Sequence, residues 1–92
     1  MNVTVEYTSQ IKRAAGHSQE SYALEENATV QDLLKRIADR HHEKLQAVLY
    51  DENDSILPTV LIFVDDKQVA NHSGQVLKDD ETVTFLSPIS GG

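Results

Sequence analysis

The C-terminal end of the chain carries its most unusual chemical group. Residues 87–92 read Ser-Pro-Ile-Ser-Gly-Gly. A glycine pair here has no turn to close and no helix to cap, which are the usual uses of its positive φ. Two residues without side chains make a tail thin enough for a narrow channel and leave the Gly92 carboxylate unobstructed, while Pro88 stiffens the start of the tail. Gly92 is therefore the candidate reactive residue, and Gly91 gives it clearance.

The alternative is a terminus without a role, since chain ends are often poorly ordered. Fully extended, the six residues from Ser87 would reach roughly 20 Å from the body of the protein. We expect residues 1–92 to form one domain, because this length suffices for a single modest core, with residues 87–92 as a flexible tail.

The histidines offer a second possible chemistry, metal binding. His41 and His42 are neighbours in the sequence, and neighbouring side chains of a helix point about 100° apart. Two helical ligands of one metal stand instead at i and i+4. Plain solvation or an interaction with the helix dipole is the simpler role, and we expect no metal site.

Other catalytic motifs are missing from the sequence. Asp51, Asn53 and Ser55 alternate as in the start of a calcium loop, but Ile56 and Ile62 stand where that loop needs glycine and glutamate. No nucleophile elbow, phosphate loop or dinucleotide fingerprint is present. The chain has no cysteine, which excludes thiolate metal sites and cysteine nucleophiles. We therefore expect a protein that is not an enzyme and binds no cofactor.

Composition and charge restrict the partners. The formal net charge is −7, which disfavours nucleic acid and anionic membranes because both attract basic surfaces. No apolar run approaches the roughly 20 residues of a membrane span, and the N-terminus lacks the features of a signal peptide. We expect a cytoplasmic protein that binds neither nucleic acid nor membrane.

The first half of the chain predicts two strands around a short helical turn. Alternating apolar and polar residues over 3–8 predict a half-buried strand. Residues 9–18 break this period and predict a helical turn that ends at Gly16. A second strand is expected at about residues 20–24, with Tyr22 and Leu24 on one face.

The main helix has the strongest local pattern. Thr29 is a natural N-cap, and Asp32 can complete a capping box. The residues that follow at i, i+3, i+4 and i+7 predict one apolar face, made up of Val30, Leu33, Leu34, Ile37, Ala38 and His41. The pattern weakens near His42, and a separate short helical turn is expected over residues 44–49.

Three further strands are expected in the second half. Residues 59–64 are β-branched and apolar without a break, which favours a central strand. A tight turn at 65–66 leads into a short strand at 67–69, Val76-Leu77 packs on the core, and the last strand covers 82–87. The order ββαβββ indicates an α+β fold, with four to five strands packed on one main helix. We expect the first and last strands to lie side by side, which places the tail at an end of the sheet.

Strands 59–64 and 82–87 also predict an apolar patch that faces away from the helix. The core is expected to take one alternate set, Val60, Ile62, Val64, Val83 and Phe85. The other set would lead toward the C-terminus, with Leu61, Phe63, Leu86 and Ile89. Exposed apolar patches usually mark interaction sites. The alternative is that a loop or a further strand covers these residues.

Four segments make the second half recognisable, namely residues 51–53, 58–66, 77–83 and the terminal Pro-x-x-Gly-Gly at 88–92. Together they resemble the ubiquitin-like sulfur-carrier family, the group of the molybdopterin-synthase small subunit and the thiamine sulfur carrier (MoaD/ThiS type). The resemblance covers essentially the whole chain. It implies a β-grasp (ubiquitin-like) fold, which agrees with the order of elements above.

The resemblance also implies a mechanism and two partners. A ubiquitin-activating-type enzyme adenylates the Gly92 carboxylate with ATP, and the acyl-adenylate takes sulfur from a persulfide to become a thiocarboxylate. The tail then enters a sulfur-acceptor enzyme, such as the molybdopterin synthase large subunit or an analogue. The residues expected to bind the partners are Phe63, Leu61, Leu86, Pro88, Ile89 and Ser90.

Several functions remain open at this point. Molybdopterin synthesis is the first candidate, followed by thiamine or cysteine synthesis. A second class is a ubiquitin-like modifier, which uses the same activated carboxylate to form an isopeptide bond with lysine. A third is a plain interaction domain in which the glycines have no role.

The chain departs from the family pattern at its turns and on the expected partner face. Two turns that usually contain glycine read Asp65-Asp66 and Asp79-Asp80. Because Asp tolerates positive φ better than most residues, we expect these turns to persist with slight strain or to change type. Leu61 stands where the family often has Asn, and Thr8 where it often has an exposed Phe. Because both residues fall on the expected partner face, the differences bear on which acceptor enzyme the chain binds.

Overall fold

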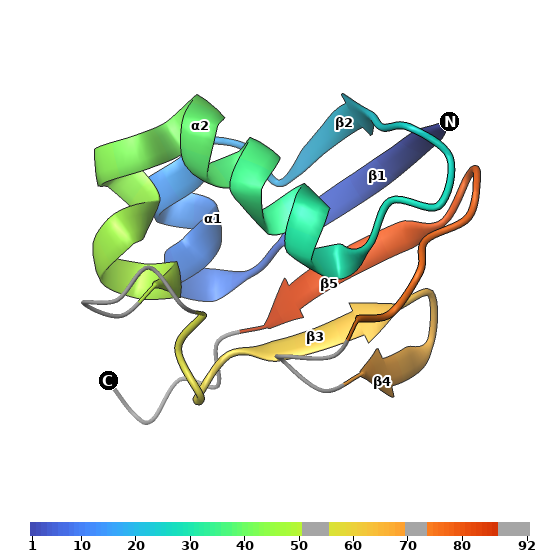
Figure 1. Ribbon diagram of the computed structural model, residues 1–92. Helices are drawn as coiled ribbons and strands as arrows, with labels where there is room; N and C mark the ends of the chain where they lie inside the picture. Colours follow the sequence, from blue (N-terminus) through green and yellow to red (C-terminus); the bar gives the residue numbers. More distant parts are fainter. Residues whose placement is uncertain (51–55, 70–73, 87–92) are drawn as a thin grey trace.

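The protein is an α+β domain in which a five-stranded mixed sheet is covered by helices (Figure 1). The computed structural model describes residues 1–50, 56–69 and 74–86, without the side chains of His42, Gln46 and Ala47. The expected loop at 51–55 and the tail at 87–92 lie outside the described residues, as does the expected loop at 71–74 except for Gly74. The elements are β1 (Asn2–Tyr7), α1 (Ser9–Ala15), β2 (Gln19–Ala23), α2 (Val30–Leu49), β3 (Leu61–Val64), β4 (Lys67–Val69) and β5 (Thr82–Leu86).

The strands lie in the order β2-β1-β5-β3-β4. β1 and β5 are parallel neighbours, with Tyr7 opposite Phe85, and this confirms the predicted pairing of the first and last strands. β3 is antiparallel to β5 on the other side, with Leu61 opposite Leu86. The middle strand is therefore β5, and β3, which pairs with both β5 and β4, is an inner strand, as the apolar run at 59–64 predicted. β3 begins only at Leu61, after a turn in which the Val60 amide donates to the Leu57 carbonyl.

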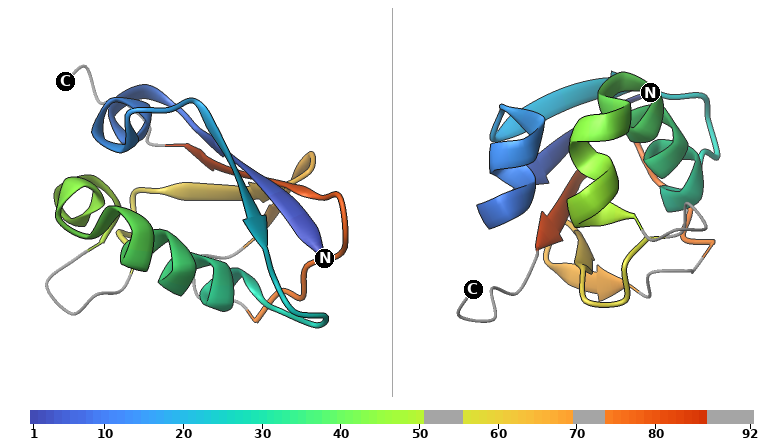
Figure 2. Two further views of the ribbon diagram at one scale, coloured as in Figure 1. Left: turned by 90° about the horizontal axis from the view of Figure 1, so that it is seen from above. Right: turned by 90° about the vertical axis from the view of Figure 1, so that its left-hand side faces the viewer.

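The core fills the space between one face of the sheet and α2, which crosses that face (Figure 2). The expected inward residues of β3 and β5 are buried, namely Ile62, Val64, Val83 and Phe85, together with Val60. Leu77 is also buried, but Val76 has 45% of its surface exposed. The prediction that both residues of this pair pack on the core was therefore right for Leu77 and wrong for Val76.

α2 is one continuous helix, whereas the sequence predicted a helix followed by a separate turn. Its start has the predicted capping box: the Asp32 amide donates to Thr29 Oγ1 at 3.2 Å, and the Thr29 amide donates to the Asp32 carboxylate at 2.9 Å. The inward face then continues at steps of four residues, through Ile37, His41, Leu45 and Leu49. His41 thus takes a polar place within an otherwise apolar stripe, and Leu45 and Leu49 continue this stripe beyond His42, where the sequence pattern weakens.

α1 lies beside α2 at the end of the sheet where β1 and β5 finish (Figure 1). It ends as predicted at Gly16, which adopts a left-handed conformation with φ 82°. The Asp turns are also kept, since Asp65 and Asp80 have φ values of 54° and 67°. The Asp65 carboxylate accepts a hydrogen bond from the Thr82 amide at 2.9 Å, which ties this turn to the start of β5. In the described ranges, neither helix has an apolar stretch long enough to cross a membrane.

Candidate functional site

The end of β5 is the point from which the tail continues, and the sheet fixes its position. β5 is paired along its length with β1 on one side and β3 on the other. A further hydrogen bond, from Thr8 Oγ1 to the Phe85 carbonyl at 3.0 Å, ties the end of β5 to the start of α1. A strand with two neighbours has no free edge, so Leu86 is held in a defined place and direction.

Three apolar side chains lie on the sheet face opposite the helices, next to this end. Leu61 and Leu86 are direct cross-strand partners, and Phe63 lies opposite Thr84, two residues along β3. Cross-strand partners bring their Cβ atoms within about 5.5 Å, so the three form one surface, which we call the outer patch (Leu61, Phe63 and Leu86). Each is half-buried, which leaves part of each side chain exposed.

The remaining predicted site residues fall within the tail. Pro88, Ile89, Ser90, Gly91 and Gly92 lie outside the described residues, and their roles stay predictions. Thr8, where the family often has phenylalanine, is half-buried, and its hydroxyl donates a hydrogen bond to the Phe85 carbonyl.

The sequence analysis missed a buried polar cluster under α2, built around Glu20 of β2. The Glu20 side chain is only 3% exposed. Its Oε1 accepts hydrogen bonds from the Tyr7 hydroxyl at 2.7 Å and the Tyr22 hydroxyl at 2.9 Å. His41 Nε2 lies 2.7 Å from Oε1 and 2.8 Å from Oε2. The signal was available, because Glu20 alternates with Tyr22 on the inward face of β2 and His41 lies on the inward face of α2.

Hydrogen bonding decides the charge of this cluster. Burial on its own raises the pKa of Glu20, but the hydrogen bonds from Tyr7, His41 and Tyr22 outweigh it and lower the pKa. Burial and the hydrogen bonds with Tyr22 and Glu20 raise the pKa of Tyr7. Glu20 is therefore an anion that accepts, and Tyr7 is a neutral donor. Arg40 adds a looser contact, with its Nε 3.6 Å from Glu20 Oε2 and its guanidinium 5.4 Å from the centre of the Tyr22 ring.

The cluster has one carboxylate and one imidazole, which is too few ligands for a typical protein metal site. Over the part of the chain that the structure describes, no group of three or more His, Cys, Asp or Glu residues gathers to hold a metal ion.

Comparison with known proteins places this geometry in a family. The family model described as the ThiS family matches residues 5–92. The molybdopterin synthase sulfur carrier subunit of Chlamydomonas reinhardtii is 26% identical over 92 residues, which cover all of both chains.

Solved structures agree with this match. The putative molybdopterin converting factor subunit 1 of Pyrococcus furiosus is 31% identical and covers 97% of this chain and 99% of its own, with a TM-score of 0.75. The SAMP1 protein of Haloferax volcanii covers 100% of both chains with a TM-score of 0.89 at 16% identity, which shows the same fold. These neighbours confirm the β-grasp fold. The chain belongs to the ThiS family of ubiquitin-like sulfur carriers, whose members are small carrier proteins rather than catalysts.

Proposed function

We propose that this protein carries sulfur as a thiocarboxylate on Gly92. The observation that supports the proposal most directly is the position of β5. This strand is the centre of the sheet, it ends at Leu86, and the chain then needs only six residues to reach Gly92. The family match also runs through residue 92. A rigid body with a short glycine-ended segment suits a carrier whose reactive group must enter the sites of other proteins.

The chemistry follows from the weakness of a carboxylate as an electrophile. An adenylating enzyme joins the Gly92 carboxylate to the α-phosphorus of ATP and releases pyrophosphate. The terminal sulfur of a persulfide then attacks the acyl carbon, and AMP leaves as a good leaving group. A second thiol cleaves the resulting S–S bond, which frees the thiocarboxylate and forms a disulfide on the donor. Gly91 and Gly92 place no side chain against either attacking group.

The outer patch is the proposed surface for the partner enzymes. It lies beside the end of β5, so a partner that covers it also receives the start of the tail. Half-exposed Leu61, Phe63 and Leu86 can bury apolar area against a partner, at about 25 cal/mol per Å². Pro88, Ile89 and Ser90 extend the proposed contact along the tail.

Molybdopterin synthesis is the proposed pathway. The support is the full-length similarity to the Chlamydomonas reinhardtii molybdopterin synthase sulfur carrier subunit, and the acceptor would then be the large subunit of that synthase. Thiamine and cysteine synthesis use the same carrier chemistry and are the alternative acceptors.

A ubiquitin-like modifier is the second candidate function. The same acyl-adenylate can pass to a lysine amine and form an isopeptide bond. One solved structure with this fold is a small archaeal modifier protein 1. At 14% identity it supports the alternative through the fold alone.

Removal of Gly91 and Gly92 tests whether the tail is the reactive part. We expect the shortened chain to support no ATP–pyrophosphate exchange by the adenylating enzyme. Its melting temperature should stay close to that of the full chain, because every described core residue lies before residue 87. Full-length protein is the control. Exchange that persists without the glycines, or a large fall in melting temperature, would contradict the proposal.

A further inference from the structure

Two exposed cations lie on α1, which packs beside the end of β5. The helix buries Ile11 and Ala15 against the core, and Lys12 and Arg13 are turned away from these two residues. Neither cation forms an ion pair with any residue that the structure describes. We call the surface around these two side chains the basic face (Lys12 and Arg13).

The basic face lines a pocket of about 540 Å³. The other lining residues are polar or small, namely Ser9, Gly16, His17 and Ser18. The described lining thus contains no carboxylate, although the chain has 15 acidic residues and only 8 Lys and Arg. Charges in the salt of a cell are screened over about 8 Å. A partner that covers this pocket therefore meets its local positive charge rather than the net charge of the whole chain.

Hydrogen bonds fix the basic face relative to the strand end from which the tail continues. Thr8 Oγ1 donates to the Phe85 carbonyl at 3.0 Å, which joins the residue before α1 to the end of β5. At the other end of the pocket, the Tyr7 amide donates to the Ser18 carbonyl at 2.9 Å. α1 is thus held at the sheet end where β1 and β5 finish (Figure 2).

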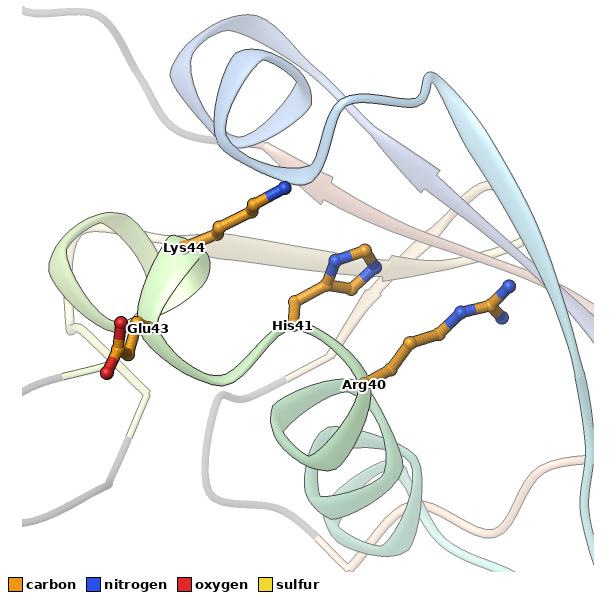
Figure 3. Close-up of a pocket in the computed structure, with 4 residues that line it drawn as sticks. All are labelled: Arg40, His41, Glu43 and Lys44. Atoms are coloured by element: carbon orange, nitrogen blue, oxygen red, sulfur yellow. The ribbon is translucent and has the colours of Figure 1, made fainter.

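The neighbouring cations of α2 are used in two different ways. Arg40 and Lys44 line a separate pocket of about 350 Å³. Arg40 lies against the buried cluster, with its Nε 3.6 Å from Glu20 Oε2 and its guanidinium over the Tyr22 ring. Figure 3 shows that Lys44 extends on the other side of His41, toward α1. α2 therefore adds positive charge on the side of α1 through Lys44, whereas Arg40 is engaged within the fold.

We propose that the basic face binds an acidic surface segment of the adenylating enzyme while the tail occupies the active site of that enzyme. The proposal rests on the proposed function, because only a carrier that is adenylated has this partner. The six residues after Leu86 span roughly 20 Å at most, so the enzyme must come close to the end of β5. The outer patch borders this end on one sheet face, and α1 borders it on the side of the helices. An enzyme that surrounds the tail therefore meets an apolar surface and a basic one.

The length of the tail also decides between a protein ligand and a nucleotide. When the tail is extended into an active site, Gly92 and the ATP with which it reacts lie roughly 20 Å from the end of β5. This distance exceeds two screening lengths of about 8 Å each, so the basic face does not act on the phosphates. Protein carboxylates are the matching ligands, because Arg13 can hold one through two parallel N–H donors and Lys12 attracts one as a point charge.

Reversal of one charge in the basic face tests the proposal. For Arg13→Glu in the full chain, we expect the KM of the adenylating enzyme for the carrier to rise about fivefold at low ionic strength, with kcat nearly unchanged. An increase in ionic strength from about 0.05 M to about 0.3 M should raise the wild-type KM and change that of the variant much less. Steady-state ATP–pyrophosphate exchange measures both constants. Lys12→Glu should act in the same direction, and Arg13→Lys, which keeps the charge, should restore a KM close to that of the wild type.

Lys35→Glu is the matched control, because it changes the net charge by the same amount. Lys35 is exposed on α2 and lines neither pocket, so its reversal should leave the KM nearly unchanged. Equal KM values for Arg13→Glu and Lys35→Glu, or a wild-type KM that does not depend on salt, would overturn the role of the basic face and leave the proposed function in place. A wild-type chain that supports no exchange would contradict the proposed function, and this proposal with it.

Discussion

At the scale of single residues, the most demanding feature of this protein is Glu20. A carboxylate buried without partners would cost several kcal/mol, and here it receives hydrogen bonds from Tyr7, Tyr22 and His41. The sequence placed Tyr22 and His41 on inward faces but gave no reason to join them. Their contact depends on how β2 passes under α2, which no local pattern encodes. The sequence could therefore show that these residues face inward, and only the folded structure shows that they meet.

The lowered pKa of Glu20 predicts a pH-dependent contribution to stability. In the folded protein this pKa lies below its ordinary value of 4.5. The stabilisation is therefore complete above about pH 4.5 and is lost as the pH falls through the lowered pKa. Glu20→Gln, which keeps the shape and removes the charge, should lower the free energy of unfolding by about 2 kcal/mol at about pH 7. Urea denaturation across a pH series measures this difference, which should shrink below about pH 4.5.

Glu6→Gln is the control for this prediction, since Glu6 is half-buried on the outer face of β1. Its effect should remain within about 0.5 kcal/mol. A difference between Glu20→Gln and the wild type that is absent, or that stays constant down to acidic pH, would show that the charge of Glu20 does not stabilise the fold.

At the scale of elements, helix ends could be predicted from local sequence more fully than strand pairing could. The start of α2 was predictable, because Thr29 and Asp32 form their capping box within four residues. The end of α1 was predictable in the same way from Gly16. The pairing of β1 with β5 was also predicted, but the place of β3 on the other side of β5 was not, because it pairs separate segments, such as Leu61 and Leu86, that no local pattern links. The continuity of α2 was missed because polar residues at 42–44 interrupt the apolar pattern, although Leu45 and Leu49 continue the inward stripe beyond them.

The sheet face formed by β3 and β5 leads to a prediction about partner binding. Leu61→Asp places a charge in the outer patch, and an enzyme that buries this patch would have to desolvate the charge. We expect the KM of the adenylating enzyme for the carrier to rise at least about tenfold, with a smaller change in kcat, because an interaction common to ground and transition states is lost. Steady-state ATP–pyrophosphate exchange measures both constants.

Ser21→Asp is the matched control for Leu61→Asp. Ser21 is exposed on the outer face of β2 and pairs with Thr4. Its replacement by Asp therefore adds the same charge to the same sheet face, away from the outer patch. It should leave both constants nearly unchanged. Equal effects of the two substitutions would mean that the outer patch is not the docking surface and that only net charge matters.

At the scale of the whole molecule, the fold and the family were accessible from the sequence. The order of elements predicted an α+β domain, the terminal Pro-x-x-Gly-Gly and the preceding strand pointed to a sulfur carrier, and both are confirmed. The identity of the acceptor was not accessible, because it depends on a surface that the partner completes. Leu61, which stands where the family often has asparagine, lies in the outer patch that we propose as the partner surface and pairs with Leu86.

The carrier role of Gly92 is the central claim, and the intact mass of the protein tests it most directly. The full chain is incubated with its adenylating enzyme, ATP and a persulfide donor, and the chain without Gly91 and Gly92 is treated in parallel. We predict that only the full chain gains the difference in mass between one sulfur and one oxygen atom, localised to its C-terminal peptide. Adducts to lysine would instead indicate a modifier. If the enzyme is shown to adenylate the chain and the mass still does not change, the proposal is contradicted.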